Sequence, residues 1–249
     1  KYNIDELDID DEKKRAILTT EGPLLIIAGP GSGKTRTLVE RVVYLISKGV
    51  EPEQIFVATF TEKAAKELIT RVSNRLLELK VHLNLNEMYI GTLHSIFLRI
   101  LEEHRDYTRL KRSYTVLDQF DQRYLIYRNI RRFLEVENSS LVLGSPRSSY
   151  WVKAETILGY VNKLSEEYIE VDKLLASEDP DIRVIGGFHK SYEELLEEEN
   201  AMDFSTIQVE TLRLLQDNPE ILATIQEKLK YFMIDEYQDT NTIQEMIVL

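Results

Sequence analysis

The sequence predicts an α/β fold, a parallel sheet packed with helices and interrupted by an inserted all-helical subdomain. Over roughly the first hundred residues, short apolar runs alternate with stretches of helical periodicity. From about residue 104 to residue 200 helical stretches follow one another without a strand signal, which returns at residues 231–234. Repeated strand–helix units imply parallel strands joined by right-handed crossovers, so the middle of the chain is an insertion.

The elements of the sheet domain begin with residues 24–27, the first expected strand. The helix after it keeps its apolar residues at helical spacing, and Gly49 is placed to cap its C-terminus. The second expected strand, residues 55–59, precedes a helix with one apolar face, made of Ala65, Leu68, Ile69, Val72 and Leu76. Residues 88–90 form a third expected strand, which leads into a helix over residues 93–104.

The second half contains three main expected helices in the insertion, over about residues 118–134, 153–164 and 182–196. Polar loops at residues 138–140 and 144–149 separate them. Helices near residues 205–215 and 219–229 then precede the strand 231–234. These assignments divide the chain into a first part of the sheet domain (1–103), the helical insertion (104–199) and a return to the sheet domain (200–249).

Composition excludes several classes of protein. The 249 residues include no cysteine, which removes disulfides, thiol catalysis and cysteine-based metal sites. No apolar run is long enough to span a membrane and the acidic N-terminus has no signal-peptide core, so a cytoplasmic location without a membrane partner is expected. The net charge of −12 speaks against non-specific nucleic-acid binding. However, residues 105–149 hold nine Lys/Arg against five Asp/Glu, so a nucleic-acid contact is possible if it is local.

The most informative motif is residues 28–35, Ala-Gly-Pro-Gly-Ser-Gly-Lys-Thr, between the first expected strand and its helix. In a phosphate loop, glycines let successive backbone N–H groups converge on phosphates at a helix N-terminus. Ala28 stands where the general pattern has its first glycine. Lys34 is placed to reach the β/γ-phosphates and Thr35 to ligate Mg²⁺. The cradle itself consists of Gly29, Gly31, Ser32 and Gly33.

An acidic motif follows the last expected strand. Asp235 and Glu236 come directly after the apolar run 231–234, and parallel sheets bind ligands at the carboxyl ends of their strands. Asp235 is a candidate Mg²⁺ ligand, and Glu236 is a candidate base for the attacking water. Mg²⁺ needs Thr35 on one side and a carboxylate on the other, so the two motifs together predict ATP hydrolysis with Lys34, Asp235 and Glu236 as catalytic residues.

Four motifs in order make the chain closely resemble superfamily 1 DNA helicases of the UvrD/Rep/PcrA type. They are Gly-Lys-Thr-Arg (33–36), Thr-Phe-Thr-Glu-Lys-Ala-Ala (59–65, similar to motif Ia), Gly-Thr-Leu-His-Ser (91–95, similar to motif Ib) and Asp-Glu-Tyr-Gln-Asp-Thr-Asn (235–241). The likeness covers nearly the whole chain. It implies a RecA-like phosphate-loop motor domain (1A), with helices on both faces of its sheet, interrupted by a helical domain (1B). The implied activity is ATP-dependent DNA unwinding, with 3′→5′ movement on single-stranded DNA.

The resemblance also implies roles for individual residues. Arg36 would lie on the adenine face, where a planar guanidinium suits stacking. Phe60 would stack on a DNA base, as aromatic residues do in single-strand channels. The remaining implied contacts to the DNA backbone, direct or through a supported neighbour, are those of Thr59, Thr61, Lys63 and His94. The implied cofactors are ATP and Mg²⁺, and the implied partners are single-stranded DNA or DNA junctions and a second motor domain of the same chain.

Three departures from the family pattern matter. Lys13 stands where the family has a glutamine that reads the adenine edge, and a lysine has donors but no acceptor, so selectivity for ATP is left open. Glu62 replaces the more usual asparagine of motif Ia, which puts a negative charge near the implied DNA path. The sequence ends soon after the acidic motif, before the family's later motifs, so we expect an N-terminal fragment with almost no activity alone.

Three other interpretations stay open at this stage. The parent protein could be the motor subunit of a helicase–nuclease that acts in recombinational repair. The chain could be a nucleotide-gated DNA-binding module without motor activity, or an unrelated phosphate-loop ATPase, which the motifs at 59–65 and 91–95 disfavour. The sequence alone fixes neither the pathway, nor the preferred DNA structure, nor the oligomeric state.

Overall fold

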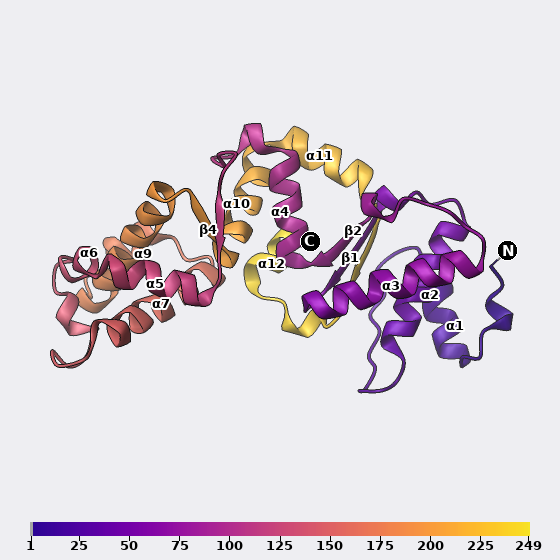
Figure 1. The fold of residues 1–249 in the computed structure, drawn as a ribbon, viewed down its shortest axis with the longest axis horizontal. Coiled ribbons are helices and arrows are strands. Elements are labelled where there is room, and N and C mark those ends of the chain that lie inside the picture. The colour runs from indigo at the N-terminus through magenta and orange to yellow at the C-terminus, as the bar shows by residue number, and fades with distance from the viewer. Residues whose placement is uncertain (1) are drawn as a thin grey trace. The chain divides into compact units, whose positions relative to one another are not determined.

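The computed structural model describes residues 2–249, and they form two compact units (Figure 1). The α/β unit comprises the residues up to Ile96 together with Pro219–Asp239, and the helical unit comprises Phe97–Asn218 together with Thr240–Leu249. The chain thus leaves the first unit, builds the second and returns. The domain limits at 103/104 and 199/200 rest on where the strand–helix pattern of the sequence changes, and they stay a prediction.

The sheet of the α/β unit has three parallel strands in the order β2-β1-β5. These are β1 (Ile55–Thr59), β2 (Tyr89–Thr92) and β5 (Tyr231–Ile234). In the register of this sheet, Val57 on the central strand is paired with Ile90 on one side and with Met233 on the other. The fold class expected from the sequence is therefore correct at the level of a mixed α/β chain with a parallel sheet.

The helices of the α/β unit are α1 (Asp11–Leu18), α2 (Lys34–Ser47), α3 (Glu62–Glu78), the start of α4 (Leu93–Glu103), and α11 (Pro219–Lys228). Thr61 begins α3 because its hydroxyl accepts the backbone N–H of Ala64, a helix N-cap. Helix α3 packs against α2 and against the strands β1 and β2. The apolar faces of the two helices meet the sheet in one core that includes Val42, Val43, Val57, Leu68 and Val72. Full burial of each such side chain stabilises the fold by about 1.5–3 kcal/mol.

The helical unit contains α5 (Gln119–Arg128), α6 (Ile130–Leu134), α7 (Tyr150–Glu166), α8 (Val171–Leu175), α9 (Pro180–Glu198), α10 (Phe204–Asp217) and α12 (Thr242–Val248). It also contains a short parallel pair of strands, β3 (Thr115–Leu117) and β4 (Ala201–Asp203). Its core is formed mainly by α5, α6, α7 and α9, with Ile126, Phe133, Ile157 and Phe188 fully buried.

A buried carboxylate ties four of these elements together. Asp203, at the end of β4, accepts hydrogen bonds from Gln122 on α5 and from the hydroxyl of Tyr192 on α9, both at 2.7 Å. Its other oxygen accepts the backbone N–H of Thr206 at 2.7 Å and so caps α10. A buried charge is tolerated only when it is hydrogen-bonded in this way, and the raised pKa of Tyr192, caused by burial and by Asp203, keeps that phenol a donor.

Two sequence-based predictions are wrong. Residues 24–27 form no strand, and their side chains are exposed, with Leu25 at 74% and Ile27 at 90%. No strand among residues 2–249 pairs with this run, and an apolar run becomes a strand only when a neighbour accepts its hydrogen bonds. The insertion is also not wholly helical, because β3 lies within it. Three residues are too few for a periodic pattern, and β3 exists only through its pairing with β4.

Other elements agree with the sequence, with small differences. Strands β1 and β5 have the expected bounds, and the expected helix over residues 118–134 is divided into α5 and α6 at Asn129. Gly49 follows α2 with a φ of 90°, the left-handed conformation expected of a residue that ends a helix. None of the helices in the described part of the chain is both long and apolar enough to cross a membrane.

Candidate nucleotide and DNA site

The phosphate-loop motif folds as a turn that leads directly into α2. Ser32 donates its backbone N–H to the carbonyl of Gly29 at 3.3 Å, and Gly33 precedes the helix with a φ of 89°. Gly31 also has a positive φ, 75°, a conformation that costs a residue with a Cβ roughly 1–2 kcal/mol. The first backbone N–H groups of α2 have no partner within the helix, so the loop presents them at its N-terminus, where an anion is favoured.

The acidic motif is positioned by the sheet. The backbone N–H of Asp235 donates to the carbonyl of Ala58 at 2.8 Å, which extends the pairing of β5 with β1. The Asp235 carboxylate in turn accepts the N–H of Glu236 at 3.1 Å. Glu236 has a φ of 55°, a left-handed conformation that residues with a Cβ seldom adopt. Strain of this kind is common at functional sites, where the surrounding structure holds it in place.

One contact joins the two motifs, which are 202 residues apart in the chain. The Lys34 ammonium lies 3.0 Å from one carboxylate oxygen of Glu236, and the Gln238 side chain donates to the other oxygen at 2.5 Å. These hydrogen bonds, first that from Lys34, hold the pKa of Glu236 below its ordinary value. The Glu236 carboxylate likewise raises the pKa of Lys34, so both groups are charged at neutral pH. The structure therefore brings together two of the three residues predicted to be catalytic, with Asp235 beside them in the chain.

Thr35 and Asp235, the predicted Mg²⁺ ligands, adjoin this ion pair in the chain. Thr35 lies in the first turn of α2 next to Lys34, and Asp235 directly precedes Glu236. Among residues 2–249, no group of three or more His, Cys, Asp or Glu side chains is arranged to hold a metal by itself. Mg²⁺ is commonly held by one or two carboxylates together with substrate phosphates. A hydroxyl and a carboxylate therefore fit a Mg²⁺ ion that a nucleotide would share.

The two residues assigned to the adenine base have partners in the N-terminal segment. Arg36 donates from Nη1 to the backbone carbonyl of Asp8 at 3.1 Å. Lys13 forms an ion pair with Asp10, the N-cap of α1. The Cε atom of Lys13 lies only 3.4 Å from the position that a Cβ on Gly33 would occupy, so this side chain runs along the phosphate loop. The structure thus brings Lys13 to the loop, and its place beside the adenine base stays a prediction.

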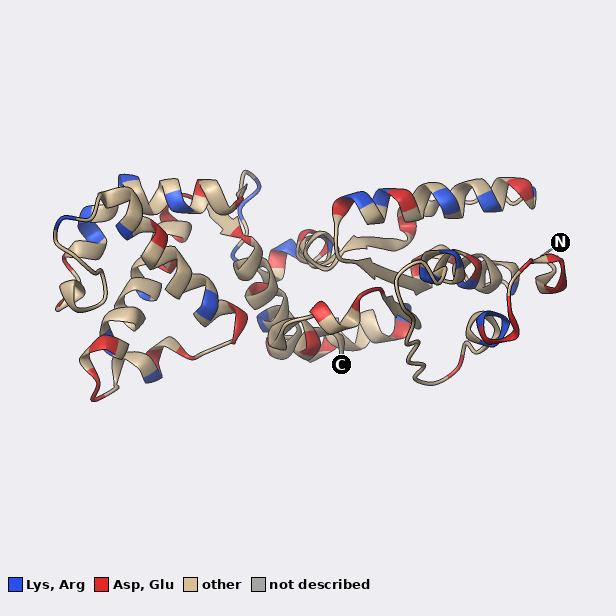
Figure 2. Ribbon diagram, turned by 90° about the horizontal axis from the view of Figure 1, so that it is seen from below, with Lys and Arg blue, Asp and Glu red and all other residues tan. Residues whose placement is uncertain are grey.

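Motif Ia forms the link from β1 to α3. Thr59 is buried, and its hydroxyl donates to the carbonyl of Thr61 at 3.2 Å, so its role is to hold the turn. Between them, Phe60 is 63% exposed at the strand end. Lys63 is exposed in the first turn of α3, the helix at upper right in Figure 2, which carries both basic and acidic residues along its length. Of this motif, the ring of Phe60 and the ammonium of Lys63 are the groups free to meet a ligand in solution.

Motif Ib is packed tightly against motif Ia. The hydroxyl of Thr92 donates to the carboxylate of Glu62 at 3.1 Å. Glu62, which stands where the family more usually has an asparagine, therefore has a hydrogen-bond partner. A Cβ on Gly91 would lie 2.4 Å from the hydroxyl oxygen of Ser95, so a larger residue there would have to displace that hydroxyl. Ser95 in turn donates to the carbonyl of Thr92 at 2.9 Å. His94 is half-buried in the first turn of α4, directly after this fixed turn.

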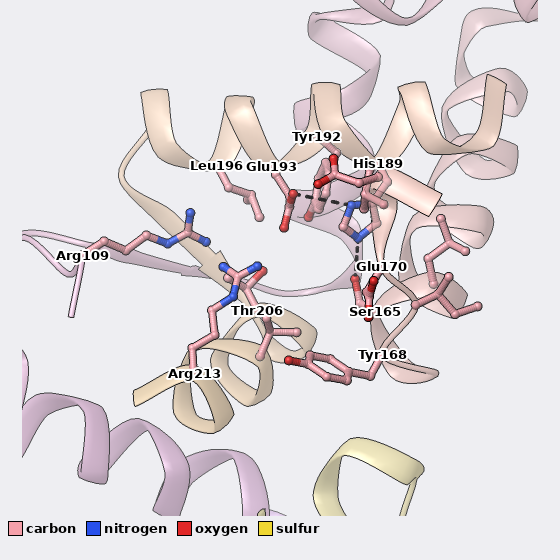
Figure 3. A pocket seen from close by; sticks show the side chains of 15 residues that line it. Arg109, Ser165, Tyr168, Glu170, His189, Tyr192, Glu193, Leu196, Thr206 and Arg213 are labelled. Atoms are coloured by element: carbon pink, nitrogen blue, oxygen red, sulfur yellow. Dashed lines mark hydrogen bonds and ion pairs between the residues drawn. The ribbon is translucent and has the colours of Figure 1, made fainter. Parts of the chain in front are cut away.

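A cavity of about 440 Å³ lies in the helical unit, and none of the residues that line it belongs to a sequence motif (Figure 3). His189, buried on α9, points into it between Ser165 and Glu193, while Arg109 and Arg213 lie across from it. The His189 Nε2 atom lies 3.0 Å from the Ser165 hydroxyl, and Nδ1 lies 3.7 Å from a Glu193 oxygen. Burial lowers the pKa of His189, which keeps the imidazole neutral at neutral pH. No sequence motif predicted this cavity, because its lining residues come from four separate helices and from the loops outside them.

The α/β unit has a parallel sheet, a glycine-rich loop at the N-terminus of a helix, and an acidic pair at the end of a strand. This is the arrangement of phosphate-loop nucleotide-binding domains. The comparison with protein families is more specific, because the model of the UvrD/REP helicase N-terminal domain matches residues 9–249. The chain belongs to this family.

Similar proteins include the ATP-dependent DNA helicase PcrA of Staphylococcus epidermidis, which is 34% identical over 243 residues. The ATP-dependent DNA helicase PcrA of Staphylococcus aureus is 33% identical over 242 residues. These alignments cover 97% and 96% of the present chain, and 31% of each relative. The chain therefore spans about a third of the length of the helicases that it matches.

Proposed function

We propose that the protein carrying this chain hydrolyses ATP to move 3′→5′ along single-stranded DNA, with residues 2–249 supplying one face of the motor. The observation that carries the proposal is the 3.0 Å contact between Lys34 and Glu236. It supports the proposal because it joins one residue of the glycine-rich motif to one residue of the acidic motif. The names of the relatives as DNA helicases support the same activity.

In the proposed chemistry, Lys34 exchanges its carboxylate partner for the β/γ-phosphate oxygens of ATP. Glu236, an acid whose ordinary pKa of 4.5 leaves it ionised at neutral pH, is then free to orient the attacking water and accept its proton. Thr35 and Asp235 would hold Mg²⁺, which would neutralise the negative charge that develops on the phosphate oxygens. Arg36 and Lys13 lie on the side of the adenine base. The cradle of Gly29, Gly31, Ser32 and Gly33 donates backbone N–H groups to the phosphates.

For the DNA, we propose that Phe60 stacks on a base and that Lys63 meets a phosphate. Both side chains are exposed at the end of β1 and the start of α3. Thr59 and Thr61 support this turn through their hydroxyl groups, and His94 extends the surface from motif Ib. Base stacking on an exposed ring is tolerant of sequence, as a translocating protein requires.

The test is the ATP turnover of the protein expressed from its full-length gene, with and without a single-stranded oligonucleotide. The substitution Glu236→Gln should leave nucleotide binding intact. It should slow ATP turnover by roughly 10²–10⁴-fold, the usual contribution of a general base. Lys34→Ala should weaken nucleotide binding itself. Glu227→Gln, which alters an exposed acid on α11, is the matched control and should change neither quantity.

Turnover that is unchanged in Glu236→Gln would show that another group is the base. Nucleotide-dependent DNA binding without turnover in the unaltered protein would instead support a gated binding module. The direction of translocation is measured separately, by following the movement of the protein toward a fluorophore placed at either the 5′ or the 3′ end of the oligonucleotide. Arrival at the 3′-end label alone would contradict the proposed direction.

A further inference from the structure

The cavity of the helical unit contains a buried nitrogen atom that no part of the fold satisfies. The ring of His189 is aimed into the cavity, and the residue is only 6% exposed (Figure 3). Its Nδ1 atom has no hydrogen-bond partner among residues 2–249. Buried polar atoms are nearly always hydrogen-bonded, because burial without a partner costs free energy. The Nδ1 atom therefore marks a position where a group from outside the chain would be held.

The neighbours of His189 determine which ring nitrogen carries the hydrogen. Ser165 donates its only hydroxyl hydrogen to the carbonyl of Val161 at 3.1 Å. The Ser165 oxygen lies 3.0 Å from Nε2, so Nε2 is the donor in that hydrogen bond. Burial lowers the pKa of His189, so the ring is neutral at neutral pH and Nδ1 keeps its lone pair. The Nδ1 atom is therefore an acceptor, and its partner must be a donor.

A carboxylate lies beside this acceptor. One oxygen of Glu193, one turn farther along α9, is 3.7 Å from Nδ1, which is too far for a hydrogen bond. Glu193 forms no ion pair with a lysine or an arginine among residues 2–249. Two acceptors thus adjoin one another, and one of them is charged. A primary ammonium group suits both, because it donates several hydrogens from one atom and its charge strengthens the bond to the carboxylate.

The wall of the cavity is suited to an aliphatic chain. Apolar side chains from α7, α8, α9, α10 and the loop before α8 line it, namely Leu164, Ile169, Val171, Leu196 and Val209. The volume of about 440 Å³ is within the range of small-molecule sites, about 300–1,000 Å³. A chain of a few CH₂ groups would therefore bury apolar surface here.

Two arginines limit what the opposite side of the cavity can accept. Arg109 and Arg213 lie across from His189 (Figure 3), and both pair with the same oxygen of Glu210, at 3.1 and 3.0 Å. A guanidinium has donors and no acceptor, and this Glu210 oxygen is already engaged twice. A second ammonium group on this side would face two positive charges. A ligand with one ammonium group is therefore favoured over a diamine.

We propose that this cavity binds an alkylammonium group, which donates to the Nδ1 atom of His189 and to Glu193 while its aliphatic chain packs against the apolar wall. A free aliphatic amine and the side chain of a lysine in a peptide share this chemistry. None of the residues that line the cavity takes part in the proposed nucleotide and DNA chemistry, so the inference is independent of the proposed function. Because the ligand would contact several helices at once, its binding would stabilise the helical unit.

The test is a titration of the 249-residue chain with n-pentylamine at neutral pH, where the amine is protonated. It is followed by nitrogen-15 NMR of the histidine side chains. The chain has four histidines, and the variant His189→Gln identifies the resonances of His189 by their loss. The Nδ1 resonance of His189 should move as the amine binds, while those of the other three histidines stay in place. The thermal unfolding midpoint should rise with the amine concentration.

Two variants and one control make the result specific. Glu193→Gln keeps the shape of the side chain and removes its charge, so it should weaken the affinity for n-pentylamine by about tenfold or more. His189→Phe keeps a ring but removes the acceptor and should abolish binding. Glu166→Gln changes an exposed acid on α7 that does not line the cavity, and it should bind the amine as the unaltered chain does. Circular dichroism of each variant verifies that the helices are intact.

A series of probes tests each part of the cavity. From methylamine to n-pentylamine, the affinity should rise by about fourfold for each CH₂ group buried against the wall. Both 1-pentanol, which has one donor and no charge, and 1,5-diaminopentane should bind more weakly than n-pentylamine. Lysine blocked at its backbone amine and carboxyl groups distinguishes the two sources. Tighter binding of blocked lysine than of n-pentylamine supports a peptide side chain, and the reverse supports a free amine.

Several outcomes would overturn the inference. A His189 resonance that does not respond to n-pentylamine shows that the cavity does not take an ammonium group. Equal affinities for n-pentylamine and 1-pentanol show that charge has no part in binding, as does an affinity unchanged in Glu193→Gln. Because these measurements need neither ATP nor DNA, their failure leaves the proposed function untouched.

Discussion

Two runs of four apolar residues precede the two halves of the candidate nucleotide site, and they differ in structure. The run 231–234 is the strand β5, hydrogen-bonded to β1 and with Met233 buried at 8% exposure. The run 24–27 has a similar composition but no strand partner in the described chain, and Ile27 is 90% exposed. An apolar run thus gives a segment the capacity to be a strand, and the partner, which lies elsewhere in the chain, decides whether it becomes one.

The turns that follow these runs differ as well. Both need a residue with positive φ, but the phosphate loop places glycine there, at 31 and 33, while the acidic turn places Glu236. Glycine takes this conformation at no steric cost, and glutamate does not. The acidic turn keeps the strained residue because its carboxylate holds Lys34. The acidic turn is therefore the less stable of the two local conformations, and it carries the carboxylate that contacts Lys34.

The largest expected effect comes from truncating one side chain in each run. Met233→Ala should destabilise the α/β unit by about 2–3 kcal/mol, because it removes buried contacts with the core. Ile27→Ala should change stability by less than about 0.5 kcal/mol, because the side chain is exposed. Denaturant unfolding followed by far-UV circular dichroism measures both. A cost for Ile27→Ala as large as that for Met233→Ala would show that residues 24–27 are paired in solution.

A smaller effect is expected within the phosphate loop itself. Gly33→Ala should cost about 1–2 kcal/mol, since a Cβ is strained at a φ of 89°. Gly29 has no positive φ, and no atom lies within 4 Å of the position of a new Cβ. The loss of stability in Gly29→Ala should therefore stay within about 0.5 kcal/mol. The same unfolding measurement compares the two. Equal costs would contradict the backbone conformation described for the loop.

The smallest effect concerns the ion pair that joins the two halves, and its sign follows from the two pKa shifts. The pKa of Glu236 is lowered from 4.5, so its contribution to stability is present above that value and is lost as the pH falls through the lowered pKa. The pKa of Lys34 is raised from 10.5, so its contribution is present below that value and is lost as the pH rises through the raised pKa. The pair should therefore stabilise the fold fully between about pH 4.5 and pH 10.5.

The unfolding midpoints of the unaltered chain and of Glu236→Gln, measured against pH, test this window. The difference between the two midpoints should narrow at acid pH, because protonation of Glu236 removes the pair in the unaltered chain. Glu245→Gln, in α12, serves as the control, since Glu245 is not paired with a cation within the described residues. A difference that stays constant from neutral pH to pH 3 would show that the Lys34–Glu236 contact does not form in solution.

The parts of the fold that could be predicted are those with local causes. The helix α3 follows from Thr61 as its N-cap and from apolar residues spaced to face the sheet, and β1 follows from its continuous apolar run. The phosphate loop was predictable because its glycines and Lys34 are consecutive. The ring contact between Trp151 and Phe120 was not predictable, because the two residues are 31 positions apart in the chain and only the packing of α7 against α5 brings them together.

By itself, the sequence determined the family, the order of the motifs and the residue types available for nucleotide chemistry, because each motif is a short run whose chemistry is local. Tertiary structure alone decided that Lys34 meets Glu236, that residues 24–27 remain unpaired, and that Asp203 is buried beneath Tyr192 and Gln122. The physical reason is the same in each case. A hydrogen bond or an ion pair needs two partners within about 3 Å, and when those partners are far apart in the chain, only the packed core determines that they meet.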